Sequence, residues 1–217
     1  MFRPTNPENT VKSSLILITS IYVALSVLFI SIVYIGNWSA IPLKFFTADP
    51  AHIFEVNPFI GVISNLGVLL WCSTACICFF AFFLLKNHSS ATYALFLLTS
   101  GILSTILLVD DLFMIHEYLV PHYLDGTDEY LYTFYLLYIL FWGYYFWGQI
   151  MRSEYWLLLL AFLFLGGSVI GDLIFPYSDM SYFIEDALKF FGIVTWFIYF
   201  ARLGYNRVCF HLQKREV

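Results

Sequence analysis

Long apolar runs separated by short polar segments dominate this chain. The runs that are long enough to cross a bilayer lie at 14–35, 60–85, 91–117, 130–150, 155–175 and 182–205. A helix needs about 20 mostly apolar residues to cross the hydrocarbon core. Such a segment must be helical, because lipid offers no hydrogen-bond partners to its backbone. The pattern therefore predicts an all-α, polytopic membrane bundle of six transmembrane helices.

The composition of the chain agrees with this class. Of its 217 residues, 61% are hydrophobic and 12% are charged, whereas soluble domains carry about 25% charged residues. A net charge of −5 argues against nucleic acid as a partner. The four cysteines form no CxxC pair, so neither a disulfide framework nor a zinc knuckle is expected. The lipid bilayer is the predicted environment.

The basic residues predict how the bundle is oriented. If the N-terminus is cytoplasmic, the outer loops hold only Lys44, and all other Lys and Arg outside the helix interiors fall on the inner side. Such an excess marks cytoplasmic segments, so both termini are predicted to be cytoplasmic. We expect one transmembrane domain over 1–217 with a basic tail at 206–217, and an outer loop at 36–59. The inner basic residues are Arg3, Lys12, Lys86, Arg152, Arg202, Arg207, Lys214 and Arg215.

Ionisable residues interrupt three of the apolar runs. A charge in hydrocarbon costs at least about 2.5 kcal/mol, so such residues usually face the bundle interior and mark a site. The rise of about 1.5 Å per helical residue places Asp110 of the third helix and Lys189 of the sixth helix roughly 10 Å below the outer helix ends. The sequence thus predicts one polar cluster near the outer leaflet. Its members are Asp110, Asp111, His116, Glu117, Asp172, Glu185, Asp186 and Lys189.

Helical spacing suggests how this cluster is arranged. Asp110 and Glu117 are seven residues apart, which places them on one face of the helix predicted at 91–117. Glu185 and Lys189 are four apart on the last helix and share a face there. Acids near a helix C-terminus need a partner. We therefore expect Lys189 to meet Asp110, with Asp172 entering from the fifth helix.

The excess of acids over one lysine suggests a bound cation or a shared proton. Carboxylate and imidazole ligands suit a divalent metal ion, and a metal-dependent hydrolase acting on a lipid or small amphiphile is one interpretation. The expected metal ligands are Asp110, His116, Glu117, Asp172 and Glu185. The expected catalytic residues are Asp110, Asp111, Glu117, Glu185 and Lys189.

Two other interpretations stay open. Crowded carboxylates raise one another's pKa, so the cluster would also suit the relay of a small proton-coupled transporter. The inner half of the bundle looks apolar, which argues against a continuous path. Alternatively, the charges form a structural ion network in an accessory subunit that binds other membrane subunits. Glu185 and Asp186 lie in the first turns of their helix, where the macrodipole favours anions.

Two segments carry resemblances to known families. DDLFMIHE at 110–117, followed by EDALKFFG at 185–192, resembles a pattern in uncharacterised six-helix bacterial membrane proteins. That resemblance covers the last four helices and implies a shared site, but no activity. We expect the chain to lie in a bacterial inner (plasma) membrane.

FEVNPFIGVISNLG at 54–67 and LLVDDLFMI at 107–115 resemble, more weakly, segments of the alkaline ceramidases. That second resemblance implies a metal-ligand role for Asp110. The family's two last-helix histidines correspond here to Glu185 and Lys189, so most of its zinc ligands are missing.

Overall fold

The computed structural model describes residues 7–87, 89–123, 128–174, 176 and 178–213, and all regular structure in these ranges is helical. The prediction of an all-α protein is confirmed. By backbone contacts the chain forms two compact units, residues 1–60 and 61–217.

The first unit contains one long helix and two short ones. Helix α1 spans Pro7–Ser39 and covers the first predicted run. The loop predicted at 36–59 contains α2 (Lys44–Thr47) and α3 (Pro50–Ile53). The Asp49 side chain caps α3 by accepting a hydrogen bond from the Ala51 N–H at 2.7 Å.

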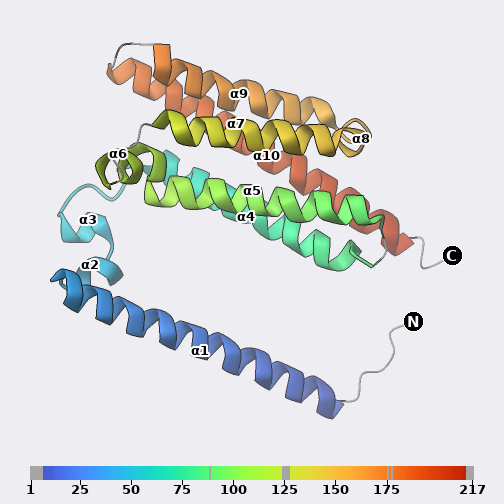
Figure 1. Ribbon diagram of the computed structural model, residues 1–217, viewed down its shortest axis with the longest axis horizontal. Coiled ribbons are helices and arrows are strands. Elements are labelled where there is room, and N and C mark those ends of the chain that lie inside the picture. Colours follow the sequence, from blue (N-terminus) through green and yellow to red (C-terminus); the bar gives the residue numbers. More distant parts are fainter. Residues whose placement is uncertain (1–6, 88, 124–127, 175, 177, 214–217) are drawn as a thin grey trace. The chain divides into compact units, whose positions relative to one another are not determined.

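The second unit is a bundle of antiparallel helices (Figure 1). Helix α10 packs against both α9 and α4, and α5 packs against α4. The Ser90 side chain starts α5 by accepting a hydrogen bond from the Tyr93 N–H. The elements are α4 (Val62–Leu85), α5 (Ala91–Phe113), the π-helix η1 (Ile115–Leu119), α6 (Val120–Tyr123), α7 (Asp128–Tyr145), α8 (Trp147–Ile150), α9 (Tyr155–Ile174) and α10 (Asp179–Gln213).

Within the described residues, five helical segments are long and apolar enough to cross a membrane, which is typical of an integral membrane protein. They are Leu15–Ser39, Val62–Leu85, Ala91–Phe113, Tyr155–Asp172 and Asp179–Cys209. The run predicted at 130–150 corresponds to α7 and α8, which are separated at Phe146. These two helices are not among the five.

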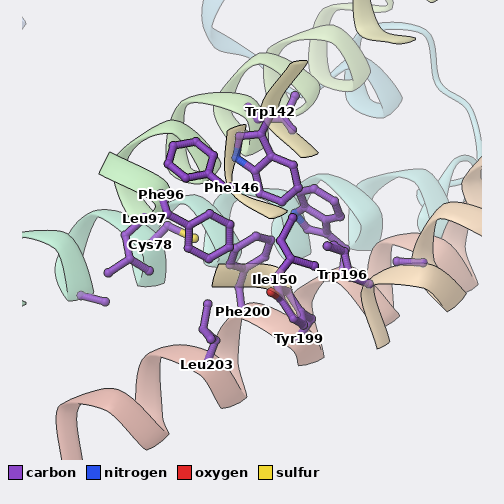
Figure 2. Packing of buried hydrophobic residues seen from close by; sticks show 14 of the residues in the cluster. Cys78, Phe96, Leu97, Trp142, Phe146, Ile150, Trp196, Tyr199, Phe200 and Leu203 are labelled. Carbon is purple, nitrogen blue, oxygen red and sulfur yellow. The ribbon is translucent and has the colours of Figure 1, made fainter. Parts of the chain in front are cut away.

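An aromatic cluster fills the centre of the second unit (Figure 2). The Phe96 ring of α5 stacks on Trp142 of α7, with 5.3 Å between ring centroids. Trp196 and Phe200 of α10 lie 5.0 Å apart and complete the contact between these helices. Offset and edge-to-face rings add specific geometry to the packing. This core therefore fixes how α5, α7 and α10 face one another.

Helices α9 and α10 pack closely at Gly192. A Cβ added at this position would lie 2.6 Å from Cγ of Leu165 and 3.0 Å from its backbone nitrogen. Only glycine allows this backbone approach, as is common between membrane helices. The contact sets the height of α10 against its neighbour, and with it the height of Lys189 one turn earlier.

Candidate functional site

The third predicted helix ends earlier than expected, and this break shapes the site. Helix α5 ends at Phe113 instead of continuing to residue 117. Met114 then adopts the left-handed conformation, with φ 48° and ψ 48°, and its N–H bonds to the Asp110 carbonyl. The chain continues as the π-helix η1. Short π-helical segments occur often at functional sites.

The prediction that Asp110 and Glu117 share one helical face is therefore wrong. Helical periodicity does not continue through a left-handed residue, because such a residue redirects the chain. The Glu117 side chain, expected to act in catalysis and metal binding, lies outside the part of the chain that the structure describes.

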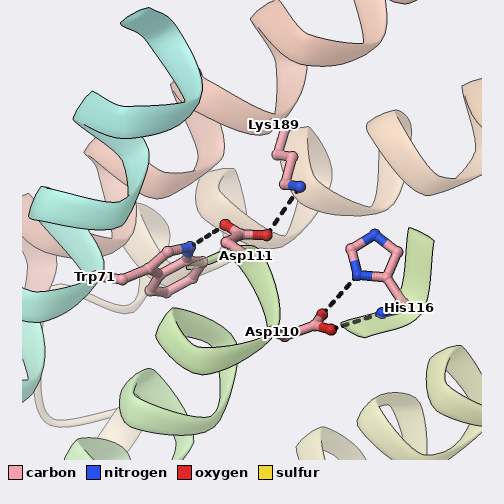
Figure 3. Close-up of polar contacts among 5 residues, drawn as sticks. All are labelled: Trp71, Asp110, Asp111, His116 and Lys189. Carbon is pink, nitrogen blue, oxygen red and sulfur yellow. Dashed lines mark hydrogen bonds and ion pairs between the residues drawn. The ribbon is translucent and has the colours of Figure 1, made fainter. Parts of the chain in front are cut away.

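The break brings His116 back onto Asp110 (Figure 3). One oxygen of Asp110 accepts the backbone N–H of His116 at 3.0 Å. The other oxygen lies 2.7 Å from the ring Nδ1 of His116. Asp110 is 3% exposed and His116 is 7% exposed. One buried carboxylate thus fixes both the backbone and the ring of the histidine.

This geometry determines which ring nitrogen of His116 can react. A carboxylate is an acceptor, so the proton of the neutral imidazole resides on Nδ1. The second nitrogen, Nε2, lies on the side of the ring away from Asp110 (Figure 3). The Tyr135 phenol of α7 also lies close enough to interact with the Asp110 carboxylate. In the neutral imidazole the lone pair is therefore on Nε2, which is the nitrogen that takes up a proton when the ring is protonated.

Asp111 has different partners from its neighbour in sequence. One of its oxygens accepts the indole N–H of Trp71 on α4 at 2.8 Å, and the other lies 2.9 Å from Nζ of Lys189 on α10. The pair Asp111–Lys189 replaces the expected pair Asp110–Lys189. Three helices are joined through one carboxylate (Figure 3). Both oxygens of Asp111 are used, which is the pattern of a structural link.

The role of Trp71 was not predicted from the sequence. The sequence does contain a signal for this role, because a tryptophan in the middle of a buried apolar helix usually needs a partner for its indole N–H. Asp111 was an available acceptor among the buried groups. What the sequence could not supply was the rotation of α4 that turns Trp71 toward α5.

The remaining predicted residues lie on α9 and α10. Asp172 is half-buried on α9, and on α10 Glu185 is half-buried while Asp186 is exposed. Among the residues that the structure describes, no three His, Cys, Asp or Glu side chains lie close enough together to hold a metal ion. The described side chains alone therefore do not form the expected metal site, and that site stays a prediction.

Three buried hydroxyl groups of α4 and α5 have hydrogen-bond partners inside the bundle. Ser104 accepts the indole N–H of Trp196 at 3.1 Å. One turn further in, the Ser100 hydroxyl donates to the Phe96 carbonyl of its own helix at 2.7 Å. Thr74 likewise donates to Leu70 on α4 at 2.8 Å. Trp196, the partner of Ser104, belongs to the aromatic core of Figure 2.

Comparisons with known proteins give a family but no activity. A family model described as "Domain of unknown function (DUF8692)" matches residues 15–203. No curated protein and no solved structure matches the chain. The function of the chain is therefore to be inferred from the chemistry of the site.

Proposed function

The chain belongs to the family described as a domain of unknown function (DUF8692), and we propose that it is a membrane-embedded hydrolase that uses His116 as its general base. The observation that supports this most is the double hydrogen bond from His116 to the buried Asp110 carboxylate. A carboxylate at Nδ1 holds the imidazole in one orientation and stabilises the imidazolium that forms when Nε2 takes up a proton.

In the proposed reaction, Nε2 of His116 removes a proton from water as the water attacks an ester carbonyl. The same nitrogen then returns that proton to the departing alkoxide. Asp110 acts as a positioning residue, because its two oxygens hold the backbone and the ring of His116. The Tyr135 phenol is close enough to the same carboxylate to help hold it in place. Each proton in the scheme is thus assigned to a group of this chain or to water.

The surroundings of the site favour an amphiphilic substrate. The pair lies at the end of a bundle whose outer surface is apolar, with Val109 and Leu112 exposed on the same stretch of α5. A lipid would reach this position from the bilayer with its polar group level with the helix ends. A lipid or small amphiphile with an ester bond is therefore the proposed substrate class.

The topology proposed for this function has six transmembrane helices, with α7 and α8 forming the fourth, in a bacterial inner membrane. Both termini are cytoplasmic, which puts His116 toward the outer leaflet. The distribution of Lys and Arg supports this orientation. A divalent metal ion bound with help from Glu117 belongs to the same proposal, and the proton transfers assigned to His116 do not require it.

The proposal is tested by lipid turnover. The purified chain in mixed micelles is incubated with a panel of ester-linked lipids, and released fatty acid is measured by mass spectrometry. His116→Gln should lower turnover by about 10²-fold or more, as general-base losses do. Asp110→Asn should lower it similarly, because the amide can no longer stabilise the imidazolium.

Asp179→Asn is the matched control, since it removes an exposed carboxylate from the same end of the bundle. This variant should keep full turnover. Turnover that is unchanged in His116→Gln would refute the general-base role. If the unaltered chain hydrolyses none of the lipids, the hydrolase proposal gives way to the second candidate.

That second candidate is a non-catalytic accessory subunit. It is favoured by the exposed aromatic side chains of α7, above all Phe141 and Tyr144, which are 70% and 85% exposed. Aromatic surfaces of this kind suit contact with a membrane partner or with lipid. Phe141→Ala and Tyr144→Ala should then weaken a complex with other membrane subunits and leave the fold intact. A chain that is monomeric and partner-free in native membranes would contradict this role.

A further inference from the structure

Two adjoining cavities lie at the other end of the second unit, away from Asp110. Their volumes are about 370 Å³ and about 240 Å³. They share Arg152, from the turn before α9, and Arg207, from the last turns of α10. The polar residues that line one or both are Ser89, Ser90, Tyr93, Gln149, Arg152, Ser153, Glu154, Asn206 and Arg207, with Tyr199 beside them.

The two arginines give these cavities a positive charge that the described residues do not neutralise. In that part of the chain, neither Arg152 nor Arg207 forms an ion pair with an acid. The acid that lines the larger cavity is Glu154, and both of its oxygens already accept hydrogen bonds from Arg202. Since Arg202 cancels that negative charge, the field inside the cavities is that of the two arginines.

A buried hydroxyl group provides a second, independent indication of a ligand. Tyr93 lines the smaller cavity and is only 5% exposed, yet its hydroxyl oxygen has no hydrogen-bond partner. The Arg207 guanidinium lies over the Tyr93 ring at 4.9 Å from its centroid and is close enough to interact with the phenol, although the hydroxyl oxygen accepts no hydrogen bond from it. Buried polar groups are almost always paired, so an unpaired one calls for a partner.

The chemistry of these groups selects one class of ligand. Arginine guanidinium groups bind phosphate through paired N–H donors. Ser89 and Ser90 stand at the start of α5, where the macrodipole also favours an anion. The Tyr93 hydroxyl can donate to a phosphate oxygen. Basic pockets between transmembrane helices on the cytoplasmic side are known to receive anionic lipid head groups.

The geometry points to a binding site for a phosphate monoester in these two cavities, held by Arg152, Arg207 and the Tyr93 hydroxyl. The topology proposed above puts this site on the cytoplasmic side. The phosphate belongs either to a lipid head group or to a soluble molecule. The site is separate from the Asp110–His116 pair, so neither proposal depends on the other's activity.

Equilibrium binding to the full chain in detergent micelles tests the site. The probe is fluorescently labelled phosphatidic acid, and diacylglycerol with the same label and tails is the comparison. Arg152→Gln and Arg207→Gln should each weaken phosphatidic acid binding about tenfold or more, because each removes a charged hydrogen-bond donor. Tyr93→Phe should weaken binding severalfold without lowering the thermal stability of the ligand-free chain, because it removes an unpaired hydroxyl.

Lys86→Gln is the matched control, since Lys86 is an exposed cation at the same end of the bundle that lines neither cavity. Its binding should be unchanged. Equal loss in Lys86→Gln and Arg207→Gln would overturn the proposal in favour of general surface charge, and equal binding of diacylglycerol would overturn it outright. Competition by inorganic phosphate identifies a soluble ligand, and binding that resists phosphate identifies a lipid head group. Both results support the site.

Discussion

Replacing Lys189 with methionine should destabilise the second unit by about 2 kcal/mol. The change removes the cation that lies 2.9 Å from Asp111 and keeps the apolar stem of the side chain. Breaking a buried ion pair from one side costs about 3–5 kcal/mol, because the other charge is left uncompensated. The Lys189 side chain is 29% exposed, so solvent screening lowers the expected cost below this range, to about 2 kcal/mol.

The same reasoning predicts the behaviour of the double variant. Asp111→Asn keeps an oxygen that can accept the Trp71 indole N–H, so its own cost should be about 1 kcal/mol. Once Lys189 is already methionine, Asp111→Asn should be neutral or stabilising, since it removes the charge that was left unpaired. The double-mutant cycle should therefore give a coupling of about 1–2 kcal/mol.

The coupling is measured from unfolding free energies of the four chains in mixed micelles titrated with denaturing detergent. The Glu154–Arg202 pair at the opposite end of the unit is the internal comparison. Both of its side chains are more exposed than those of the buried pair, so its coupling should be smaller and should fall faster with added salt. Additive effects of Lys189→Met and Asp111→Asn would refute the assignment of these two residues as partners.

Two further predictions concern packing and pH. Gly192→Ala should cost about 1–3 kcal/mol of unfolding free energy, because the new methyl group would collide with Leu165. Gly166→Ala, which meets no atom within 4 Å, is its control, and an equally stable Gly192→Ala chain would contradict the close approach. The hydrogen bonds from Arg202 lower the pKa of the Glu154 carboxyl. A carboxyl group whose pKa is lower in the folded than in the unfolded chain stabilises the fold at pH values above its unfolded pKa. The contribution of Glu154 to the free energy of unfolding is therefore complete at neutral pH, and it is lost as the pH falls through the pKa of the folded chain. Unfolding midpoints measured against pH should show this loss of stability at acid pH in the unaltered chain, and a smaller loss in Glu154→Gln.

The sequence predicted most of the helices because apolar length is a strong signal. The runs at 60–85 and 155–175 correspond closely to α4 (Val62–Leu85) and α9 (Tyr155–Ile174). The end of α5 was not predictable in the same way. No glycine or proline lies between Asp110 and His116, so the segment has the pattern of a continuous helix. The left-handed Met114 is compensated by hydrogen bonds that form only after the chain has turned.

The pairing of charges was also only partly predictable. Periodicity within one helix gives the relative directions of Asp110 and Asp111, about 100° apart, but it does not give the rotation of that helix against α4 and α10. The rotation is set by contacts such as the Trp196–Phe200 cluster and Gly192, which are distributed over the bundle. The expectation of a polar site on the third and sixth helices could therefore be stated from sequence, whereas the partner of each carboxylate could not.

The left-handed turn at Met114 has a consequence for how the molecule would respond to strain. Asp110 and His116 belong to one short stretch of chain, so their contact does not depend on the spacing between helices. The link through Asp111 instead spans separate helices and depends on their spacing. If thinning of the bilayer or heating drives those helices apart, the ion pair between Asp111 and Lys189 should break first, while His116 stays hydrogen-bonded to Asp110.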